Sequence, residues 1–307
     1  MPDDSPPLIR PARESDMQPA FGVFRRAIMA YIQRQGIALP PSTNEDRQDE
    51  AWRLRGPWIE HLWRTSAENW VAESGDGRVV GWAMSVQRGE MLELTHFFVD
   101  PDVQAKGLGH GLLARAFPAG RGPHRSIVAT YDPAALSLYL RSGVRFVTTV
   151  VDFETRPREV RVETDLRFET LAESDAAVDL IAGIEAAVIG NRREVDTRFV
   201  LGQRPAWAAF RGDVPVGFAF GHRDELTGPI GALEPRDIPA LLAHVENEAA
   251  RAGAANVYFS TPLANDEAVR YLLGRGYRVD PFLVAILADD LSMRLDRWIH
   301  TGLSYIL

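Results

Sequence analysis

The sequence predicts a mixed α/β protein built from two tandem domains of the same kind. Its 307 residues are enough for about two domains of roughly 150 residues each. A strand–turn–strand pattern and a helical pattern each occur twice, once in each half of the chain. Short apolar strands also alternate with helical patterns in both halves, which is typical of mixed α/β domains.

The repeat is clearest in two pairs of segments. WVAESGDGRVVGWAM begins at Trp70 and WAAFRGDVPVGFAF begins at Trp207, and each predicts a strand, a tight Gly-Asp turn and a second strand. DPAALSLYLRSG at Asp132–Gly143 corresponds to NDEAVRYLLGRG at Asn265–Gly276, with one constant offset in residue number. Recurrent turn chemistry is the alternative explanation, but a constant offset across a whole helix favours two homologous domains.

The first half predicts strands and helices in a definite order. The order is a strand at Leu8–Pro11, helices at about 16–33 and 46–66, a hairpin near 69–87 and a strand at about Met91–Val99. A glycine turn then leads into a helix that reaches Phe117, followed by a strand in HRSIVATY, a helix in PAALSLYLRS and a strand in VTTVVDFE. The alternating apolar side chains of Val151 and Phe153 support the last strand.

The charged stretch Thr155–Glu163 predicts the boundary between the domains, which gives a first domain at 1–158 and a second at 159–307. Each is then close to the roughly 150 residues of an ordinary domain. The closing segment LSMRLDRWIHTGLSYIL is expected to pack as a helix and an edge strand.

Composition and charge exclude several classes of protein. Hydrophobic residues make up 46% and charged residues 25% of the chain, as in an ordinary globular protein. No apolar run approaches the roughly 20 residues of a membrane helix, and the acidic, proline-rich start is unlike a signal peptide, so a cytoplasmic location is expected. The absence of cysteine excludes disulfides and cysteine nucleophiles. A net charge of −8 argues against a nucleic-acid partner, and the scattered histidines predict no metal site.

The segment FFVDPDVQAKGLGHGLLARAF joins a strand to a helix through three closely spaced glycines. Exposed N–H groups at a helix start form an anion site, and glycine lets an oxyanion approach the backbone. The spacing fits neither the dinucleotide fingerprint nor the P-loop. The pattern that does match is Gln-x-x-Gly-x-Gly at Gln104, Gly107 and Gly109. Lys106, the one lysine of the chain, either adds charge beside a diphosphate or is simply solvated.

This pattern resembles the acyl-CoA pyrophosphate loop of the GNAT superfamily, the general N-acetyltransferases. The resemblance covers most of residues 8–155, from LIRPARESDM to the helix that carries Ala135, Tyr139 and Gly143. That helix is similar to the family motif Asn-x-x-Ala-x-x-x-Tyr-x-x-x-Gly-Phe, with Asp132 in place of Asn and Val144 directly after the glycine. The resemblance implies that each half has a mostly antiparallel, twisted central sheet flanked by helices.

The resemblance also implies a reaction. An acetyl group would pass directly from acetyl-CoA, the co-substrate, to a primary amine of a small molecule or peptide, without a covalent enzyme intermediate or a metal. A non-catalytic acyl-CoA sensor or interaction protein is the alternative. Neither a nucleic acid nor a membrane is an expected partner, and a homodimer is left open. The implied cofactor contacts are Phe97, Phe98, Val99, Gln104, Ala105, Lys106, Gly107, Leu108, Gly109, His110, Asp132 and Ala135.

Two steps of this reaction would fall to groups that match the family. Tyr139 occupies the position of the family's tyrosine, so it would protonate the leaving thiolate; a core tyrosine on the same helical stripe is the alternative. A backbone N–H of Phe97 or Phe98 would stabilise the oxyanion, while Val99 would hold the pantetheine arm.

The general base has two candidates. The resemblance implies Glu93, acting through water. In a regular strand, alternation places Glu93, Thr95, Phe97 and Val99 on one face, so His96 faces the other way unless a bulge re-aims it. The ordinary pKa of histidine, near 6.5, makes His96 the second candidate, and a solvated role for both remains open.

The segment from Ala27 to Trp70 is rich in tryptophan and arginine, and by the resemblance it borders the acceptor amine. Arginine binds carboxylates and aromatic rings bind ammonium groups, but these side chains also suit a helix packing stripe. The acceptor itself stays open among side-chain amines, antibiotics, amino acids and peptide N-termini. The tryptophan and arginine residues of this segment are Trp52, Arg53, Arg55, Trp58 and Trp63.

The second half has lost the elements of the first that carry chemistry. The shorter RDIPALL replaces DVQAKGLGHGLL, and its Pro239 removes an N–H group. Leu272 occupies the position of Tyr139, and about Thr227 that of Glu93. A structural or substrate-lining role is therefore expected for this half, although Asn265 leaves a remnant cofactor groove as an alternative.

Overall fold

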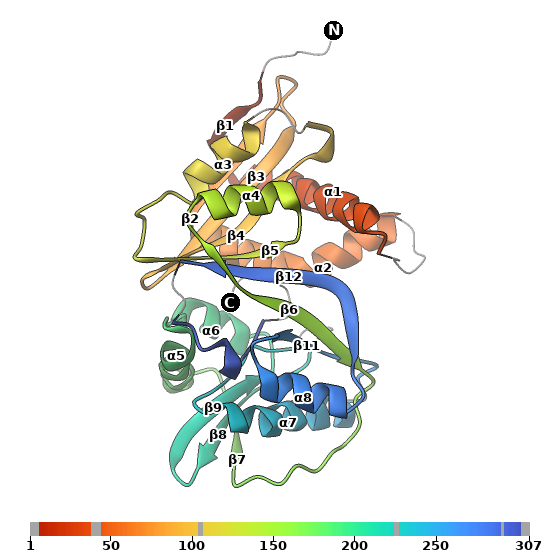
Figure 1. The fold of residues 1–307 in the computed structure, drawn as a ribbon, viewed down its shortest axis with the longest axis vertical. Helices are drawn as coiled ribbons and strands as arrows, with labels where there is room; N and C mark the ends of the chain where they lie inside the picture. The colour runs from red at the N-terminus through yellow and green to blue at the C-terminus, as the bar shows by residue number, and fades with distance from the viewer. Residues whose placement is uncertain (1–5, 38–43, 104–106, 224–226, 290–291, 302–307) are drawn as a thin grey trace. The chain divides into compact units, whose positions relative to one another are not determined.

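The computed structural model describes residues 6–37, 44–103, 107–223, 227–289 and 292–301. The chain forms two compact units, coloured from red to yellow-green and from green to blue in Figure 1. Unit 1 comprises Met1–Ile127 with Tyr131–Arg145, and unit 2 comprises Val128–Thr130 with Phe146–Leu307.

Unit 1 contains the elements predicted for the first half, in the predicted order (Figure 1). Its first part is β1 Leu8–Pro11, η1 Glu14–Asp16, α1 Met17–Gln35, α2 Asn44–Arg64, β2 Ser66–Glu73, β3 Val79–Arg88 and β4 Met91–Val99. Then follow η2 Pro101–Val103, α3 Leu108–Ala116, the start of β5 His124–Thr130, and α4 Pro133–Arg141.

The sheet of unit 1 runs in the order β1-β2-β3-β4-β5. Strands β1 to β4 pair antiparallel, and β4 pairs parallel with β5. Strand β3 is buried along almost its whole length, because α1 and α3 both pack against it. Gly36, with φ of 68°, ends α1 in the left-handed conformation that glycine adopts without strain.

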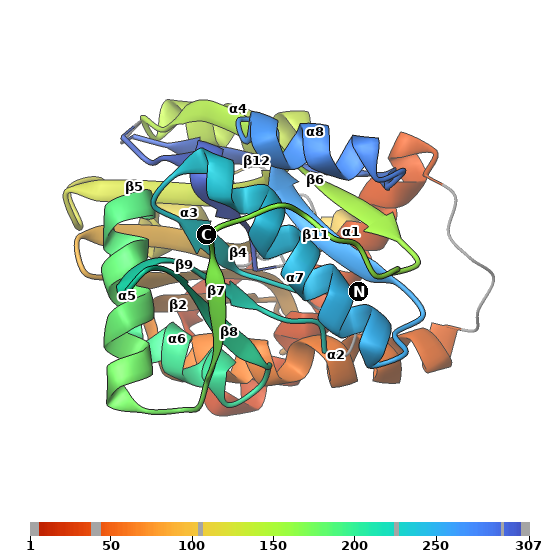
Figure 2. The same ribbon diagram turned by 90° about the horizontal axis from the view of Figure 1, so that it is seen from below.

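Unit 2 contains two sheets, in the orders β12-β6-β11 and β13-β10-β9-β8-β7. Helix α7 packs against α8, and α5 against α6 (Figure 2). The first part is β6 Arg145–Thr155, β7 Arg167–Leu171, α5 Asp175–Ile189, α6 Glu194–Leu201, β8 Ala206–Arg211, β9 Val214–Phe220 and β10 Ile230–Ala232. The second part is η3 Pro235–Asp237, α7 Ile238–Arg251, β11 Val257–Pro262, α8 Asp266–Gly274, β12 Arg278–Ala288, η4 Leu295–Arg297 and β13 Trp298–Ile299.

The order of elements confirms the tandem repeat predicted from the sequence. From β7 to β12, strands, helices and the 3₁₀ turn follow in the order seen from β1 to β6, apart from the short turn η1 before α1. Helices α4 and α8 are separated by the same number of residues as strands β6 and β12, at both ends of each element. The mixed α/β class is confirmed with it.

Strand β6 closes the first repeat in the sequence but lies in unit 2. It pairs antiparallel with β11 along its second half, with Phe153 opposite Phe259 and Val151 opposite Thr261. All four side chains are almost fully buried, so the ladder is part of the core of unit 2. The compact units therefore divide at the start of β6. The boundary of the sequence repeats at 158/159 is a separate division and stays a prediction.

The charged stretch after β6 is held against α7 by paired polar contacts. The N–H of Val160 donates to Oδ1 of Asn247 at 2.7 Å, and Nδ2 of Asn247 donates back to the Val160 carbonyl at 2.9 Å. The N–H of Arg158 donates to Glu246, whose carboxylate lies 2.7 Å from Arg275. The stretch is thus anchored at two consecutive helix residues.

The closing segment differs from its prediction. In place of a helix, the described residues form one 3₁₀ turn, Leu295–Arg297. The expected edge strand is present as β13, which pairs with β10 at Ile230 and Gly231. Trp298 and Ile299 are fully buried, so these two side chains fix the described part of the segment, 292–301. Leu291 and residues 302–307 lie outside the described residues.

Strand β6 belongs to the first sequence repeat but pairs with β11 inside unit 2. We therefore predict that the two sequence halves do not fold separately. Fragment 1–158 keeps β6 but lacks β11, and fragment 159–307 keeps β11 but lacks β6, so each exposes an unpaired apolar strand. We expect neither fragment alone to unfold cooperatively on heating, as followed by circular dichroism. Mixing the two should restore a transition, and a cooperative transition of 1–158 alone would contradict the prediction.

Candidate functional site

A β-bulge in β4 determines which side chains face one another in unit 1. Met84 lies opposite His96, but the next residue of β3, Ser85, lies opposite Leu94. Thr95 is therefore the extra residue of a bulge, and its hydroxyl donates to the Met84 carbonyl at 3.1 Å. The expected regular alternation from Glu93 to Val99 is wrong, because the bulge shifts the pattern by one residue.

The bulge brings the two candidate bases onto the same face of the sheet. Residues directly opposite each other in an antiparallel pair share a face. By their partners Val86, Met84 and Trp82, the face of Glu93 also carries His96 and Phe98. The opposite face carries Phe97, together with α4.

His96 is a packed and uncharged side chain. It is 1% exposed, its ring is stacked on Trp82 with centroids 4.2 Å apart, and Phe24 meets it edge-on. Nδ1 lies 3.1 Å from the Thr95 hydroxyl. Burial lowers the pKa of His96 to about 3, so the imidazole is neutral at physiological pH and is a poor proton acceptor.

Glu93 is buried in the middle of the sheet, 4% exposed. It lies opposite Val86 in β3 and opposite Ser126 in β5. The Ser126 hydroxyl is fully buried and has no hydrogen-bond partner among the described residues. This serine was missed in the sequence because a single strand serine carries no motif, and only the parallel β4–β5 pairing places it beside Glu93.

Tyr139 lies on the other face, in contact with Phe97. The two rings are 5.6 Å apart in an edge-on arrangement, and the tyrosine is 4% exposed. Burial, with a smaller contribution from the Asp132 charge, raises the pKa of Tyr139. The phenol therefore keeps its proton at physiological pH, and its role as an acid remains a prediction.

Strands β4 and β5 pair over only part of their length. The parallel ladder runs from Met91 opposite His124 to Leu94 opposite Ile127, although β4 continues to Val99. The ladder thus ends at the bulge, and the backbone that follows, including Phe97 and Phe98, is not bonded to β5 in the ladder. This is where the predicted oxyanion donors lie.

The predicted glycine loop is described from Gly107 onward. Gln104, Ala105 and Lys106 lie outside the described residues. Gly107 has φ of 93° and directly precedes α3, and its carbonyl accepts the first helical bond, from Gly111 at 2.9 Å. The N–H groups of the three residues between them have no acceptor inside the helix. Among the described residues, and apart from its own neighbours in the chain, no atom lies within 4 Å of a Cβ built on Gly107.

The other two glycines of the loop have different surroundings. A Cβ on Gly109 would lie 3.4 Å from both Leu138 and Phe97, an ordinary contact. A Cβ on Gly111 would lie only 2.7 Å from Cδ1 of Ile9. Gly111 therefore allows α3 to pack closely on β1, whereas Gly107 supplies the left-handed backbone at the helix start.

Asp132 caps α4 and also forms an ion pair. Its Oδ1 accepts the N–H groups of Ala134 and Ala135 at 3.0 and 3.1 Å, and its Oδ2 lies 2.8 Å from Nη2 of Arg34 in α1. The carboxylate is thus engaged within the protein, and contacts of Asp132 and Ala135 with a cofactor stay predictions.

An ion pair at the end of β4, between a buried aspartate and a half-exposed arginine, was not predicted from the sequence. Asp100 is 4% exposed, and its Oδ2 lies 2.8 Å from Nε and 2.7 Å from Nη2 of Arg26. Its Oδ1 accepts the N–H of Asp102 at 3.1 Å. No spacing rule links Arg26 to Asp100, because they come from separate elements.

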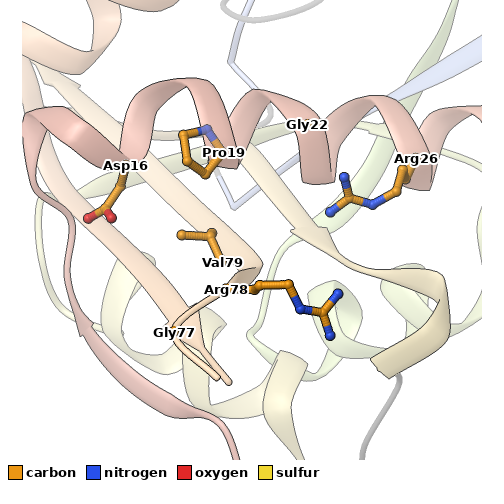
Figure 3. A pocket seen from close by; sticks show the side chains of 7 residues that line it. All are labelled: Asp16, Pro19, Gly22, Arg26, Gly77, Arg78 and Val79. Atoms are coloured by element: carbon orange, nitrogen blue, oxygen red, sulfur yellow. The ribbon is translucent and has the colours of Figure 1, made fainter. Parts of the chain in front are cut away.

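A pocket of about 430 Å³ lies between α1 and the β2–β3 hairpin. Figure 3 shows the Asp16 carboxylate at one end and the guanidinium groups of Arg26 and Arg78 at the other. Each charge is already paired, with Arg10, Asp100 and Asp76 respectively. The pocket therefore offers a ligand no unmatched charge.

The tryptophan-rich segment is mostly a packing surface. Trp58 and Trp63 are 4% and 9% exposed, and the Trp63 ring lies 5.6 Å from that of Trp82. Trp52 meets Phe21 edge-on at 5.0 Å. These side chains join α1 and α2 to the sheet, as the packing alternative predicted.

In unit 2, the equivalent helix start is occupied by a carboxylate. Turn η3 runs directly into α7, with Asp237 at the N-cap. Asp237 is 4% exposed and lies 2.6 Å from Nη2 of Arg211. The start of α7 therefore carries a buried, ion-paired carboxylate, whereas Gly107 precedes α3. Leu272, opposite in the repeat to Tyr139, is fully buried.

Within the described part of the chain, no group of three or more histidine, aspartate and glutamate side chains could hold a metal ion. No described helix is both long and apolar enough to cross a membrane.

Comparison with known proteins relates part of the chain to a family. Residues 35–144 match the acetyltransferase (GNAT) family, a segment that includes β4, the glycine loop and α4. No curated protein is similar in sequence. The match to the GNAT family thus covers about a third of a chain whose elements repeat in tandem.

Solved structures share the fold of the whole chain. A putative acetyltransferase from Pyrococcus horikoshii has a TM-score of 0.73 at 16% identity, covering 99% of this chain and 97% of that one. A GCN5-related N-acetyltransferase from Sphaerobacter thermophilus has a TM-score of 0.59 at 15% identity, covering 93% and 96%. A tandem GNAT protein from the clavulanic acid biosynthesis pathway has a TM-score of 0.50 at 16% identity, covering 92% and 96%. The fold is that of tandem GNAT proteins.

The buried His96 predicts a loss of stability in acid. Its folded pKa, about 3, lies below its ordinary value of 6.5, so the unfolded state binds a proton first as the pH falls. Stability conferred by the neutral ring is complete above pH 6.5 and falls by about 1.4 kcal/mol per pH unit towards pH 3. In the variant H96F, the slope of the unfolding free energy against pH should be smaller by about 1.4 kcal/mol per pH unit, which is the contribution of one proton. H110Q, which removes an exposed histidine, is the control, and equal slopes for H96F and the parent would refute the assignment.

The glycine geometry predicts opposite stability effects at two positions. Gly107→Ala should cost about 1 kcal/mol, because alanine is strained at φ of 93°. Gly109→Ala should be neutral or gain about 0.5 kcal/mol, since alanine favours the helix and the space is sufficient. Urea denaturation measures both, and a larger loss for Gly109→Ala would show that the loop is packed differently.

Proposed function

We propose that the protein is an acetyl-CoA-dependent N-acetyltransferase that acetylates a primary amine of a small molecule or peptide directly. The observation that carries the proposal is the start of α3. There, Gly107 has a left-handed backbone with no described atom beyond its chain neighbours within 4 Å of a built Cβ, and the N–H groups that follow have no helical acceptors.

The loop supports binding of a diphosphate. N–H groups at a helix start carry partial positive charge and favour an anion. Those of Leu108, Gly109 and His110 would bind the diphosphate, and Gln104, Ala105 and Lys106 precede them in the chain. The unpaired edge of β4, from Phe97 to Val99, would bind the pantetheine arm by backbone hydrogen bonds. A backbone N–H there would polarise the thioester carbonyl.

The surroundings of the two candidate bases favour Glu93. A general base works best when its pKa lies near the working pH, and the pKa of His96 is lowered to about 3. Its ring is also held by Trp82. Glu93 lies on the same face as His96 and beside the Ser126 hydroxyl, so it would take the proton of the amine through water. His96 would then shape this face by packing.

Tyr139 would protonate the leaving thiolate from the opposite face. Its raised pKa keeps the phenol protonated in the free protein, and a hydrogen bond to the leaving thiolate would be needed to lower that pKa so that the proton can move. The transfer is completed when the phenolate regains a proton from solvent. The proposed acceptor is a free amine in the cytoplasm, and unit 2 would have a structural or substrate-lining role.

Isothermal titration with acetyl-CoA tests the proposal first. Binding in the micromolar range is expected, and no binding at millimolar concentration would end it. A mass-spectrometric screen of amines with acetyl-CoA then identifies the acceptor by a product heavier by one acetyl group. Tight binding without any acetylated product would favour the alternative, a non-catalytic acyl-CoA sensor.

Two substitutions test the assigned roles. Glu93→Gln and Tyr139→Phe should each lower kcat by about a hundredfold or more, because each removes a proton-transfer group, with KM for acetyl-CoA little changed. Glu90→Gln is the control for Glu93, since Glu90 is an exposed carboxylate at the turn before β4. An unchanged kcat in either variant would show that its residue has only a packing role. Thermal denaturation of each variant would exclude misfolding as the cause of a lower kcat.

A further inference from the structure

Helix α1 is tied to the chain just beyond the end of β4. The Arg26 guanidinium holds the buried Asp100 carboxylate through Nε and Nη2. The same carboxylate accepts the N–H of Asp102, and the Asp100 carbonyl accepts that of Val103 at 3.0 Å. The ion pair therefore fixes the turn η2, which leads into the glycine loop.

The same helix is also tied to the turn beyond β5. Nη2 of Arg34 lies 2.8 Å from Asp132, the N-cap of α4. The Tyr31 hydroxyl accepts the backbone N–H of Tyr131 at 3.3 Å. Two side chains from the C-terminal half of α1 thus hold two consecutive residues of this turn.

The distance along α1 between Arg26 and Arg34 is larger than the spacing of two paired strands, as expected if β4 and β5 have diverged where these side chains make their contacts. Arg26 and Arg34 are about two helical turns, or about 12 Å, apart along α1. Paired strands lie only about 4.8 Å apart, and the β4–β5 ladder ends at Leu94 and Ile127. Helix α1 therefore connects the two chain segments that follow the divergence of the strands.

We propose that α1 is a clamp: Arg26, Tyr31 and Arg34 hold the segments after β4 and β5 at the separation that acyl-CoA binding requires. This inference rests on the proposed function, because it assigns that site its positioning residues. None of the three is a catalytic residue, since each acts through Asp100, Tyr131 or Asp132.

The clamp also accounts for the aspartate at position 132. Asparagine caps a helix as well as aspartate does, so capping of α4 alone does not require the charge. The charge is used by Arg34. Asp132→Asn therefore removes the ion pair and leaves the cap, which separates the two roles in one substitution.

Hydrogen–deuterium exchange of the free protein tests the clamp without cofactor. In R26Q, the hydrogen-bonded amides of Asp102 and Val103 should exchange about tenfold faster, because the turn opens locally more often. In R34Q, the same should hold for Tyr131–Ala135. The control is E60Q, which breaks the exposed pair of Glu60 with Arg64 on α2 and should change neither segment. Unchanged exchange in both R26Q and R34Q overturns the clamp.

Affinity for acetyl-CoA provides the second measurement. R34Q and D132N should each raise the Kd for acetyl-CoA by about threefold to fivefold, as expected for a solvent-accessible ion pair, and kcat of R34Q should stay within about twofold of the parent. The double variant should be no weaker than either single one, because both remove the same pair. If Asp132 instead touches the cofactor directly, D132N raises the Kd for acetyl-CoA by the same factor in the parent and in R34Q. That result would overturn the clamp.

The two measurements separate failure of the clamp from failure of the proposed function. Faster exchange in R26Q and R34Q, with no acetyl-CoA binding by the parent, shows that α1 fixes both segments and rejects the proposed function, and with it the role of the clamp in acyl-CoA binding. Binding by the parent with unchanged exchange, and with affinities equal to that of E60Q, rejects the clamp and leaves the function standing.

Discussion

The bulge at Thr95 is the constraint on which the candidate site depends. One extra residue in β4 moves His96 to the face of Glu93 and sends Phe97 to the face of Tyr139. The parallel ladder with β5 ends at Leu94, beside the bulge. A single bulge thus determines which side chains lie on each face of β4. The pairing with β5 ends beside the strand edge at which the pantetheine arm is proposed to bind.

Much of the fold could be predicted from the sequence, because it depends on local patterns. Alternation located β4 within its observed bounds, and the constant offset between the halves anticipated the matching helices α4 and α8. The site was less predictable. A bulge leaves no mark on composition, so the faces of Phe97 and Val99 were assigned wrongly. The contact of Arg26 with Asp100 was missed because it joins residues far apart in the sequence.

The two units differ at the helix start on which the proposed anion site depends. In unit 1, four residues that end at Gly107 separate turn η2 from α3. In unit 2, turn η3 runs directly into α7, and Asp237 at that point is paired with Arg211. The order of elements is the same in both units, so the difference lies in the length of the connection, its glycines and the buried carboxylate.

The exchange of β6 into unit 2 has a consequence for the history of the gene. Once the last strand of the first copy had come to depend on β11, a deletion of the second copy would have cost the first its partner strand. Selection could therefore erase the glycines of the second copy freely, but not the copy itself. On this view, the second copy is retained because β6 of the first copy needs β11 as its partner strand.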